Sequence, residues 1–317
     1  MTRRLLPLLV LPLLLPPAVF AQSSSERYAA ECRALVGPLP AFSCADGVPV
    51  PVTVEGQPVT DPVPQMTCDR PGLLDNGPGS DGQCVPGSRI LNLSTDSMQV
   101  SVMCRQKVIR PPDSLQFDEL DVIAHNPATG ATCWFHATGS REAPVEGAAV
   151  PSPTEAVDDG FWHAPETTAA AGCGTCHDND PFMYSPFVGQ VWQAVPVAPF
   201  GRYFHAGGEF GFDQWPTETF DLRDNTCLGC HRIGMAETCS NLTRLMTGRS
   251  PPPGADARAL AWPLSHAMPP GAGLTPESWQ AIHGASVADV LSCCADPDQQ
   301  ACRKTPLPRA LPAGSAP

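Results

Sequence analysis

Cysteine is the residue type that most constrains this chain. Fourteen cysteines are spread over 317 residues, far more than a protein in a reducing cytosol usually carries. Four of them stand in two copies of one pattern, Cys173-Gly174-Thr175-Cys176-His177 and Cys227-Leu228-Gly229-Cys230-His231. The other cysteines form a group of six before residue 140 and a group of four after the second copy. This division predicts two kinds of sulfur chemistry in one chain.

The repeated pattern is Cys-x-x-Cys-His, the spacing at which heme is attached covalently. Two thiols three positions apart can each form a thioether to a heme vinyl group, and the adjacent histidine supplies an axial ligand to the iron. The sequence therefore predicts two heme c groups. The covalent and axial residues are Cys173, Cys176 and His177 for the first heme, and Cys227, Cys230 and His231 for the second.

Zinc binding and dithiol redox chemistry use the same residue types. Paired Cys-x-x-Cys zinc sites usually have roughly 15–20 residues between the pairs. The segment from Cys176 to Cys227 is much longer, and a histidine follows each pair. A thioredoxin-like dithiol needs a βαβ setting and gives no reason for a repeat. Heme attachment is the interpretation that explains both copies together.

On these two motifs the chain resembles the diheme c-type cytochromes over roughly residues 158–302. The motifs do not identify a subfamily. The resemblance implies a further axial ligand for each iron, usually His or Met. For the second heme the candidates are Met268, which lies in a Met-Pro loop like that of small cytochromes c, and His266. For the first heme the candidates are His205, His163 and Met183.

The resemblance implies an electron carrier that transfers electrons between redox partners, and no catalytic residue is predicted. The alternative is a peroxidase-like or oxidase-like enzyme with one open heme iron. Known diheme peroxidases keep their motifs further apart, and no distal set of Arg, His and Glu is recognisable here. A third hypothesis is an assembly module, in which the N-terminal half docks on a larger complex while the hemes relay charge.

The charge balance restricts the class of partner. The chain has 32 acidic and 19 basic residues, a net charge of -13. An acidic surface argues against nucleic acid and anionic membranes as partners. We expect a redox protein with a basic surface, and an association that weakens as salt is added.

The first 21 residues predict export. Arg3-Arg4 precede a Leu-rich run over residues 5–15, and small residues lead up to Ala21. This is the pattern of a signal peptide, for which a twin-arginine signal is the less favoured variant. No later apolar run has the roughly 18 residues that a transmembrane helix needs. The mature chain is therefore expected in the periplasm or outside the cell, where disulfides persist.

The remaining cysteines predict five disulfides. Because both groups are even, each region can close its own bridges. Direct pairing of the neighbours Cys293 and Cys294 would strain the ring, so each is expected to bond elsewhere, with Cys239 and Cys302 as the partners.

The predicted fold class is α+β, with a β-rich disulfide-linked domain followed by a mostly helical and loop-rich diheme domain. The segments are a signal peptide (1–21), the β-rich domain (22–140), a linker (141–159), the diheme domain (160–302) and a disordered tail (303–317).

Apolar alternation predicts strands within 90–104 and over 120–125 and 131–137, the last two joined by a turn. His125 and His136 are expected on the surface of these strands. Capping signals predict helices after Ser185-Pro186, over 235–249, and from Thr275 with an interruption at Gly284.

Overall fold

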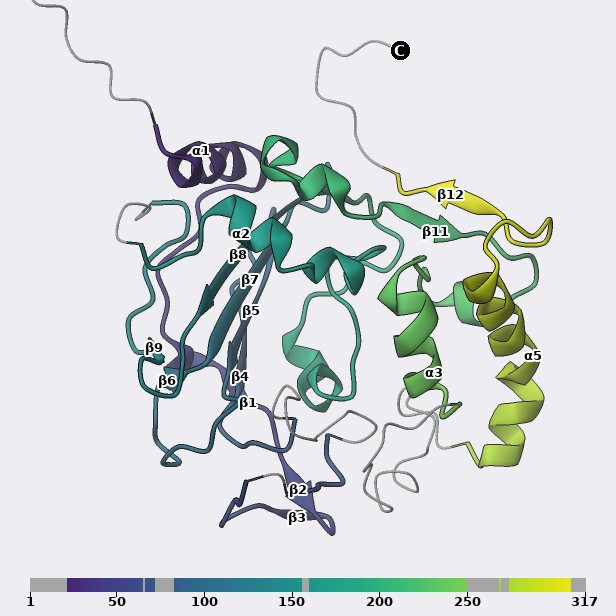
Figure 1. Ribbon diagram of the computed structural model, residues 1–317, viewed down its shortest axis with the longest axis horizontal. Coiled ribbons are helices and arrows are strands. Elements are labelled where there is room, and N and C mark those ends of the chain that lie inside the picture. The colour runs from purple at the N-terminus through teal and green to yellow at the C-terminus, as the bar shows by residue number, and fades with distance from the viewer. Residues whose placement is uncertain are drawn as a thin grey trace, which may run out of the picture.

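The computed structural model describes residues 22–64, 66–71, 83–155, 160–249, 268 and 274–308. Helices and strands are mixed, so the α+β class is confirmed. A six-stranded sheet with the order β1-β4-β5-β7-β8-β10 lies on one side of the molecule (Figure 1). The helices α3 (Thr243–Met246) and α5 (Pro276–Ala295) lie on the other side. The strands of the sheet are β1 (Val48–Pro49), β4 (Arg89–Asn92), β5 (Gln99–Arg105), β7 (Glu119–His125), β8 (Ala131–Thr138) and β10 (Phe204–His205).

The long strands form an antiparallel meander in which alternate side chains share a face. Val102 of β5 pairs with Val122 of β7, and Leu120 pairs with Ala137 of β8. Because side chains alternate between faces, these residues form one apolar face of the sheet, and all are buried. The expected strands are confirmed, with the stretch 90–104 forming two of them.

The turn between β7 and β8 depends on a glycine. Gly130 has a φ of +90°, and a Cβ there would lie 2.6 Å from the backbone carbonyl carbon of Arg202. That close approach lets β10 join the sheet parallel to β8, with Phe204 opposite Ala131. The sheet thus includes a strand from the segment between the two Cys-x-x-Cys-His motifs.

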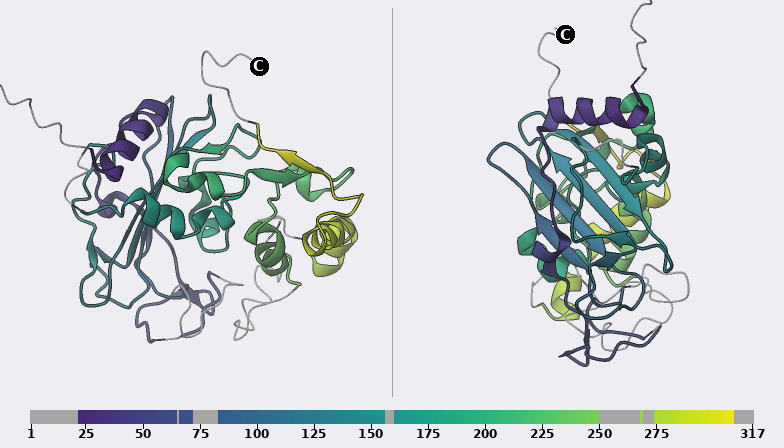
Figure 2. Two further views of the ribbon diagram at one scale, coloured as in Figure 1. Left: turned by 45° about the horizontal axis from the view of Figure 1, so that its top comes forward. Right: turned by 90° about the vertical axis from the view of Figure 1, so that its left-hand side faces the viewer.

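The N-terminal helix α1 (Ser24–Val36) lies close to the strands (Figure 2). Its buried side chains belong to one hydrophobic core with those of the sheet. Ser23 and Glu26 form a capping box that satisfies the first backbone N–H groups. Tyr28 is buried, and its hydroxyl accepts a 2.9 Å hydrogen bond from the backbone N–H of Trp134 in β8. Cys32 forms a disulfide with Cys133, so the helix is also tied covalently to the sheet.

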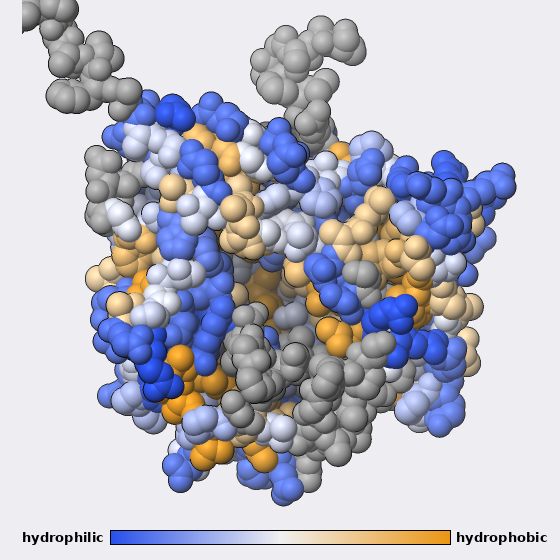
Figure 3. Space-filling model, in the orientation of Figure 1, coloured by the Kyte–Doolittle hydropathy of each residue, from blue (hydrophilic) through white to orange (hydrophobic). Residues whose placement is uncertain are grey.

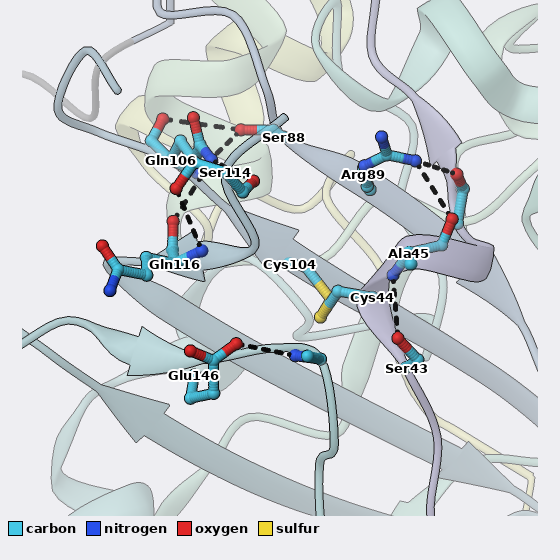
Figure 4. Close-up of a disulfide and its surroundings, with 12 residues drawn as sticks. Ser43, Cys44, Ala45, Ser88, Arg89, Cys104, Gln106, Ser114, Gln116 and Glu146 are labelled. Carbon is cyan, nitrogen blue, oxygen red and sulfur yellow. Dashed lines mark hydrogen bonds between the residues drawn. A yellow bond between two sulfur atoms is a disulfide. The ribbon is translucent and has the colours of Figure 1, made fainter. Parts of the chain in front are cut away.

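Five disulfides use ten of the cysteines, as predicted. Three join cysteines before residue 140, and two join cysteines after the second motif. The pairs are Cys32–Cys133, Cys44–Cys104, Cys68–Cys84, Cys239–Cys294 and Cys293–Cys302. Figure 4 shows the second bridge, where the short helix η1 (Cys44–Asp46) is held against β5 while Arg89 donates to the carbonyl of Ala45 at 3.2 Å.

The opposite face of the sheet is covered by residues 182–195. Phe187 and Val191 are buried against Ile90 of β4. The helix expected after Ser185 is a short 3-10 segment instead, η4 (Val188–Ala194), with non-helical backbone at Val191. Its N-cap is Phe187, although the hydroxyl of Ser185 accepts a hydrogen bond from the N–H of Val188. The apolar stripe follows the sheet surface rather than a continuous helix.

The rest of the second half is built from short elements and one long helix. A π-helical turn (Thr238–Leu242) runs into α3 (Thr243–Met246), which covers part of the expected 235–249 helix. The long helix α5 (Pro276–Ala295) starts at the N-cap Thr275, as predicted. It continues through Gly284, so the predicted interruption is wrong.

The remaining elements are short. They are β2 (Thr53–Val54), β3 (Gln57–Pro58), β6 (Gln116–Phe117), β9 (Val145–Glu146), α2 (Pro165–Ala170), η3 (Cys173–Thr175), η5 (Gly208–Phe210), η6 (Phe212–Gln214), β11 (Glu218–Phe220), η7 (Cys227–Gly229) and β12 (Lys304–Pro306).

Two segments expected to be linker and tail are packed where they are described. In 141–155, Val150 is buried and bridges to Phe42. In 303–308, β12 pairs with β11, and Leu307 is buried. The boundaries between domains stay a prediction, and the expected signal peptide lies outside the described residues. Within the described residues, no helix is both long and apolar enough to cross a membrane.

Candidate functional site

The first Cys-x-x-Cys-His motif lies on a tight turn after α2. The helix η3 begins at Cys173, and the N–H of His177 donates to the carbonyl of Cys173 at 2.9 Å. Gly174 lies against the indole of Trp215, where a Cβ would come within 2.2 Å of a ring carbon. The glycine inside the motif is therefore required by the packing of this turn.

His177 lies in the interior. Its imidazole is 5.0 Å from the ring of Trp134 in β8, centroid to centroid. Burial lowers the pKa of His177 to about 4, so the ring is neutral at pH 7. Its Nδ1 makes no hydrogen bond to any described residue. A neutral imidazole carries the lone pair that a metal ligand requires.

The second motif lies on an equivalent turn, η7, held by α5. Asn225 accepts a hydrogen bond from the N–H of Cys227 and donates to the carbonyl of Ser286 in α5. The Nδ1 of His231 lies 2.6 Å from the carbonyl oxygen of Arg232. A carbonyl can only accept, so Nδ1 carries a proton, and in the neutral ring Nε2 keeps the lone pair. This is the tautomer of a histidine that binds a metal through Nε2.

An apolar cavity of about 300 Å³ adjoins the second motif. Cys227, Cys230 and His231 of the motif line it, together with aromatic residues such as Phe182, Tyr184 and Trp192. Three methionines also line it, namely Met183, Met246 and Met268. Figure 3 shows apolar side chains among polar ones on the face that carries α3. Mostly apolar lining with a few polar groups is typical of cofactor sites.

The structure brings two predicted ligands to this cavity and adds one that sequence reasoning missed. Met268 and Met183 were candidates for different hemes, and both line the cavity of the second motif. Met246 was not among the predicted ligands. Its carbonyl accepts a 3.1 Å hydrogen bond from the N–H of Met268. The only signal in the sequence was its position on a helix shortly after the motif. His266 lies outside the described residues.

The two motifs are linked directly through Asp178. Its carboxylate accepts hydrogen bonds from the N–H of Ala236 at 2.7 Å and the hydroxyl of Thr238 at 2.7 Å. The same hydroxyl lies 2.9 Å from the carbonyl of Cys176. Burial raises the pKa of Asp178 to about 6. Residues that follow the second motif therefore hold the turn of the first.

Asp180 and Arg232, which follow the first and the second motif, are two buried polar residues whose charges act on each other. Burial raises the pKa of Asp180 to about 7, although the charge of Arg232 works in the opposite direction. Arg232 donates through Nη2 to the carbonyl of Gly201 at 2.6 Å. Its Nη1 makes no hydrogen bond to a described residue.

His205 lies beside the first motif but has the wrong tautomer for a ligand. The indole N–H of Trp134 donates to its Nδ1 at 3.2 Å. Burial lowers the pKa of His205 to about 4, so the ring is neutral. A neutral imidazole that accepts at Nδ1 carries its proton on Nε2, which then has no lone pair for a metal. Ligation by His205 would require this hydrogen bond to break.

His163 lies further along the same sheet face. Its Nε2 is 3.1 Å from the hydroxyl of Thr138, and its ring is 5.1 Å from that of His136. His136 in turn lies 2.7 Å from Asp121, whose negative charge raises the pKa of His136 against the effect of burial. His163 therefore belongs to a polar cluster at the end of β8.

His125 and His136 are buried rather than exposed, so that expectation was wrong. The chain after residue 160 covers the sheet face on which they lie. His136, Asp121 and Glu119 place their ligand atoms within 4.8 Å of one another. The neighbouring Lys107 already pairs with Glu119 at 2.8 Å.

The four motif cysteines take part in none of the five disulfides. The residues of the second motif fit a heme, because Cys227, Cys230 and His231 all line one apolar cavity. The first motif offers the same atoms around a buried neutral imidazole.

The chain matches no family model, no curated protein and no solved structure. The assignment of this chain to the diheme c-type cytochromes, made from the two motifs, is therefore wrong. The motifs are too short to define a family, and the rest of the chain shares no detectable similarity with one.

Proposed function

We propose that this chain is an exported electron-transfer protein that attaches two hemes covalently through Cys-x-x-Cys-His. The observation that carries the proposal is the division of the cysteines. Ten pair in disulfides, and the four that do not are the four of the motifs. In an oxidising compartment, thiols that remain outside disulfides need another bond to protect them, and a thioether is such a bond.

Heme supplies one-electron redox chemistry when it is bound. The chain's own residues would hold and orient it. The thiols of each motif would attach the ring, and His177 and His231 would supply ligands to the iron. The carbonyl of Arg232 fixes the tautomer of His231. The contacts of Asp178 and Thr238 keep the two motifs adjacent, which is the arrangement that electron exchange between two centres needs.

For the distal side of the second heme we propose Met268, as its sequence context indicated. Its position on the cavity wall and the backbone hydrogen bond to Met246 support this choice. Met183 and Met246 line the same cavity and are the alternatives.

The second candidate function is an enzyme whose first heme iron keeps an open position. The tautomer of His205 favours it, because this residue is not ready to ligate. Binding of carbon monoxide or cyanide to one of the two hemes would support this alternative. Two low-spin hemes that bind neither would support the carrier.

The partner that we propose is a redox protein with a basic surface. The net charge of -13 would steer such a protein towards this one, and added salt would slow the encounter. Export is supported by the five disulfides, which persist in oxidising compartments.

Heme attachment is tested by expression in a host that matures covalent heme proteins, followed by mass spectrometry under denaturing conditions. We expect two hemes on the wild type. Cys173→Ser with Cys176→Ser should remove one, and Cys227→Ser with Cys230→Ser should remove the other. The matched control, Cys68→Ser with Cys84→Ser, changes a disulfide and should keep both. A wild-type chain without heme, in a host that loads a reference protein fully, would refute the proposal.

A further inference from the structure

Arg232 is a buried cation with an unused hydrogen-bond donor. Arg232 follows His231 directly in the sequence, and only 9% of its surface is exposed. Nη2 donates to the carbonyl of Gly201, but Nη1 makes no hydrogen bond to a described residue. A buried donor without a partner loses its hydration and gains nothing in return. Nη1 of the guanidinium therefore lacks an acceptor among the described residues.

Asp180 does not supply this acceptor. Asp180 lies close enough for its charge to act on Arg232. Its carboxylate accepts a 3.1 Å hydrogen bond from the N–H of Phe182, two residues along the chain. No ion pair within 4.0 Å joins Asp180 to Arg232 among the described residues. The missing acceptor must come from outside these side chains.

The position of Arg232 shows where that acceptor would lie. Arg232 lines the apolar cavity of the second motif and also an adjoining cavity of about 310 Å³. His231 lines both as well. The planar fork of a guanidinium matches a carboxylate, which can accept two parallel hydrogen bonds. A carboxylate held at the edge of the second motif would meet Arg232.

We infer that Arg232 is an anion-binding residue that receives a carboxylate of the group held at the second motif, namely a heme propionate. This inference rests on the proposed heme attachment. The pairing would fix the rotation of the ring in its cavity. It would also place a positive charge beside one of the two redox centres, which favours the reduced state of that centre because reduction adds an electron.

Arg232→Gln and Arg232→Lys test the inference, with Arg223→Gln as the matched control. Arg223 is an exposed arginine of the same segment, so its variant removes the same charge at the surface. All proteins are loaded with heme and titrated potentiometrically. Arg232→Gln should lower one midpoint potential and leave the other nearly unchanged. We expect about a tenfold change in the reduction equilibrium, or about 59 mV for one electron. Arg223→Gln should change both potentials far less.

Arg232→Lys keeps the positive charge but loses the planar fork of N–H donors. This variant tests the inference if Arg232→Gln does not fold. Its resonance Raman spectrum should show a shifted propionate bending band for one heme. An Arg232→Gln protein with two hemes and potentials equal to those of the control would overturn the inference, as would an unshifted Raman band in Arg232→Lys. Neither result would affect the proposed function. A wild-type chain without covalent heme would instead refute that proposal.

Discussion

The hydroxyl of Tyr203 donates a 2.6 Å hydrogen bond to the backbone carbonyl of His177. Tyr203 is buried, and burial raises its phenol pKa far above the ordinary value, so the hydroxyl keeps its proton at any physiological pH. Its own backbone N–H donates to the carbonyl of Pro308 at 2.8 Å. One residue next to β10 thus connects the first motif to the C-terminal end of the described chain.

Tyr203→Phe should therefore destabilise the protein. The change removes one donor and leaves the buried carbonyl of His177 without it, which costs about 1–3 kcal/mol. Urea denaturation measures this loss. Tyr184→Phe deletes the same atom from a tyrosine that packs against Trp192 and is the control. Equal stability of the Tyr203 variant and the wild type would contradict the structural role given to this hydrogen bond.

Gly234→Ala should disturb the connection between the motifs. A Cβ at Gly234 would lie 2.0 Å from the carboxyl carbon of Asp178, which Ala236 and Thr238 hold in place. Overpacking of this kind typically costs about 1–3 kcal/mol. The free energy of unfolding should fall by at least about 1 kcal/mol. Gly201→Ala is the control, because the nearest atoms to its Cβ would be at an ordinary 3.4 Å. Equal effects of the two variants would show that Asp178 can move.

Asp180→Asn should change how stability depends on pH. Burial raises the pKa of Asp180 from 3.8 to about 7. Between these values the folded state keeps a proton that the unfolded chain releases, so the free energy of unfolding falls as pH rises through this window. Asparagine has no charge to bury, and its carbonyl can still accept from Phe182. The variant should match the wild type near pH 4 and exceed it at pH 8 by up to roughly 4 kcal/mol.

Urea denaturation at the two pH values gives this difference. Asp213→Asn removes an exposed carboxylate and is the control. A stability difference between wild type and Asp180→Asn that is the same at both pH values would mean that Asp180 ionises normally in the folded state.

Loss of the Cys239–Cys294 disulfide should destabilise the second motif more than loss of Cys68–Cys84 destabilises the N-terminal loops. The first bridge closes a sequence separation of 55 residues and the second one of 16. Chain entropy predicts losses of about 4 and about 3 kcal/mol, respectively. Double alanine variants and thermal denaturation test the order. A larger loss of stability in the variant without Cys68 and Cys84 would show that native packing, not chain entropy, determines the order.

The sequence allowed prediction where the signal was local. Alternation of apolar residues located β7 and β8, because one face of each strand packs on the core. Capping chemistry located the start of α5 at Thr275. The even cysteine counts on each side of the motifs predicted which regions close their own disulfides. Each of these signals lies within a few residues or follows from counting.

Features that depend on distant contacts could not be predicted. The tautomer of His205 is set by Trp134, 71 positions away. The stripe from Phe187 to Val195 has helical spacing, but contact with the sheet breaks the helix at Val191. Arg232 looked like an ordinary charged residue, since nothing in its neighbours shows that Gly201 and the cavities enclose it. Two short motifs likewise could not establish a family for the whole chain.

The disulfide pattern has a topological consequence for the segment between the motifs. Each bridge lies entirely before the first motif or entirely after the second, so no covalent loop encloses residues 134–238. The part of this stretch that follows β8 can separate from the sheet and return without any sulfur–sulfur bond being broken. A large rigid group could therefore be added to the chain after the N-terminal bridges have closed, and the order of oxidation and loading need not be fixed.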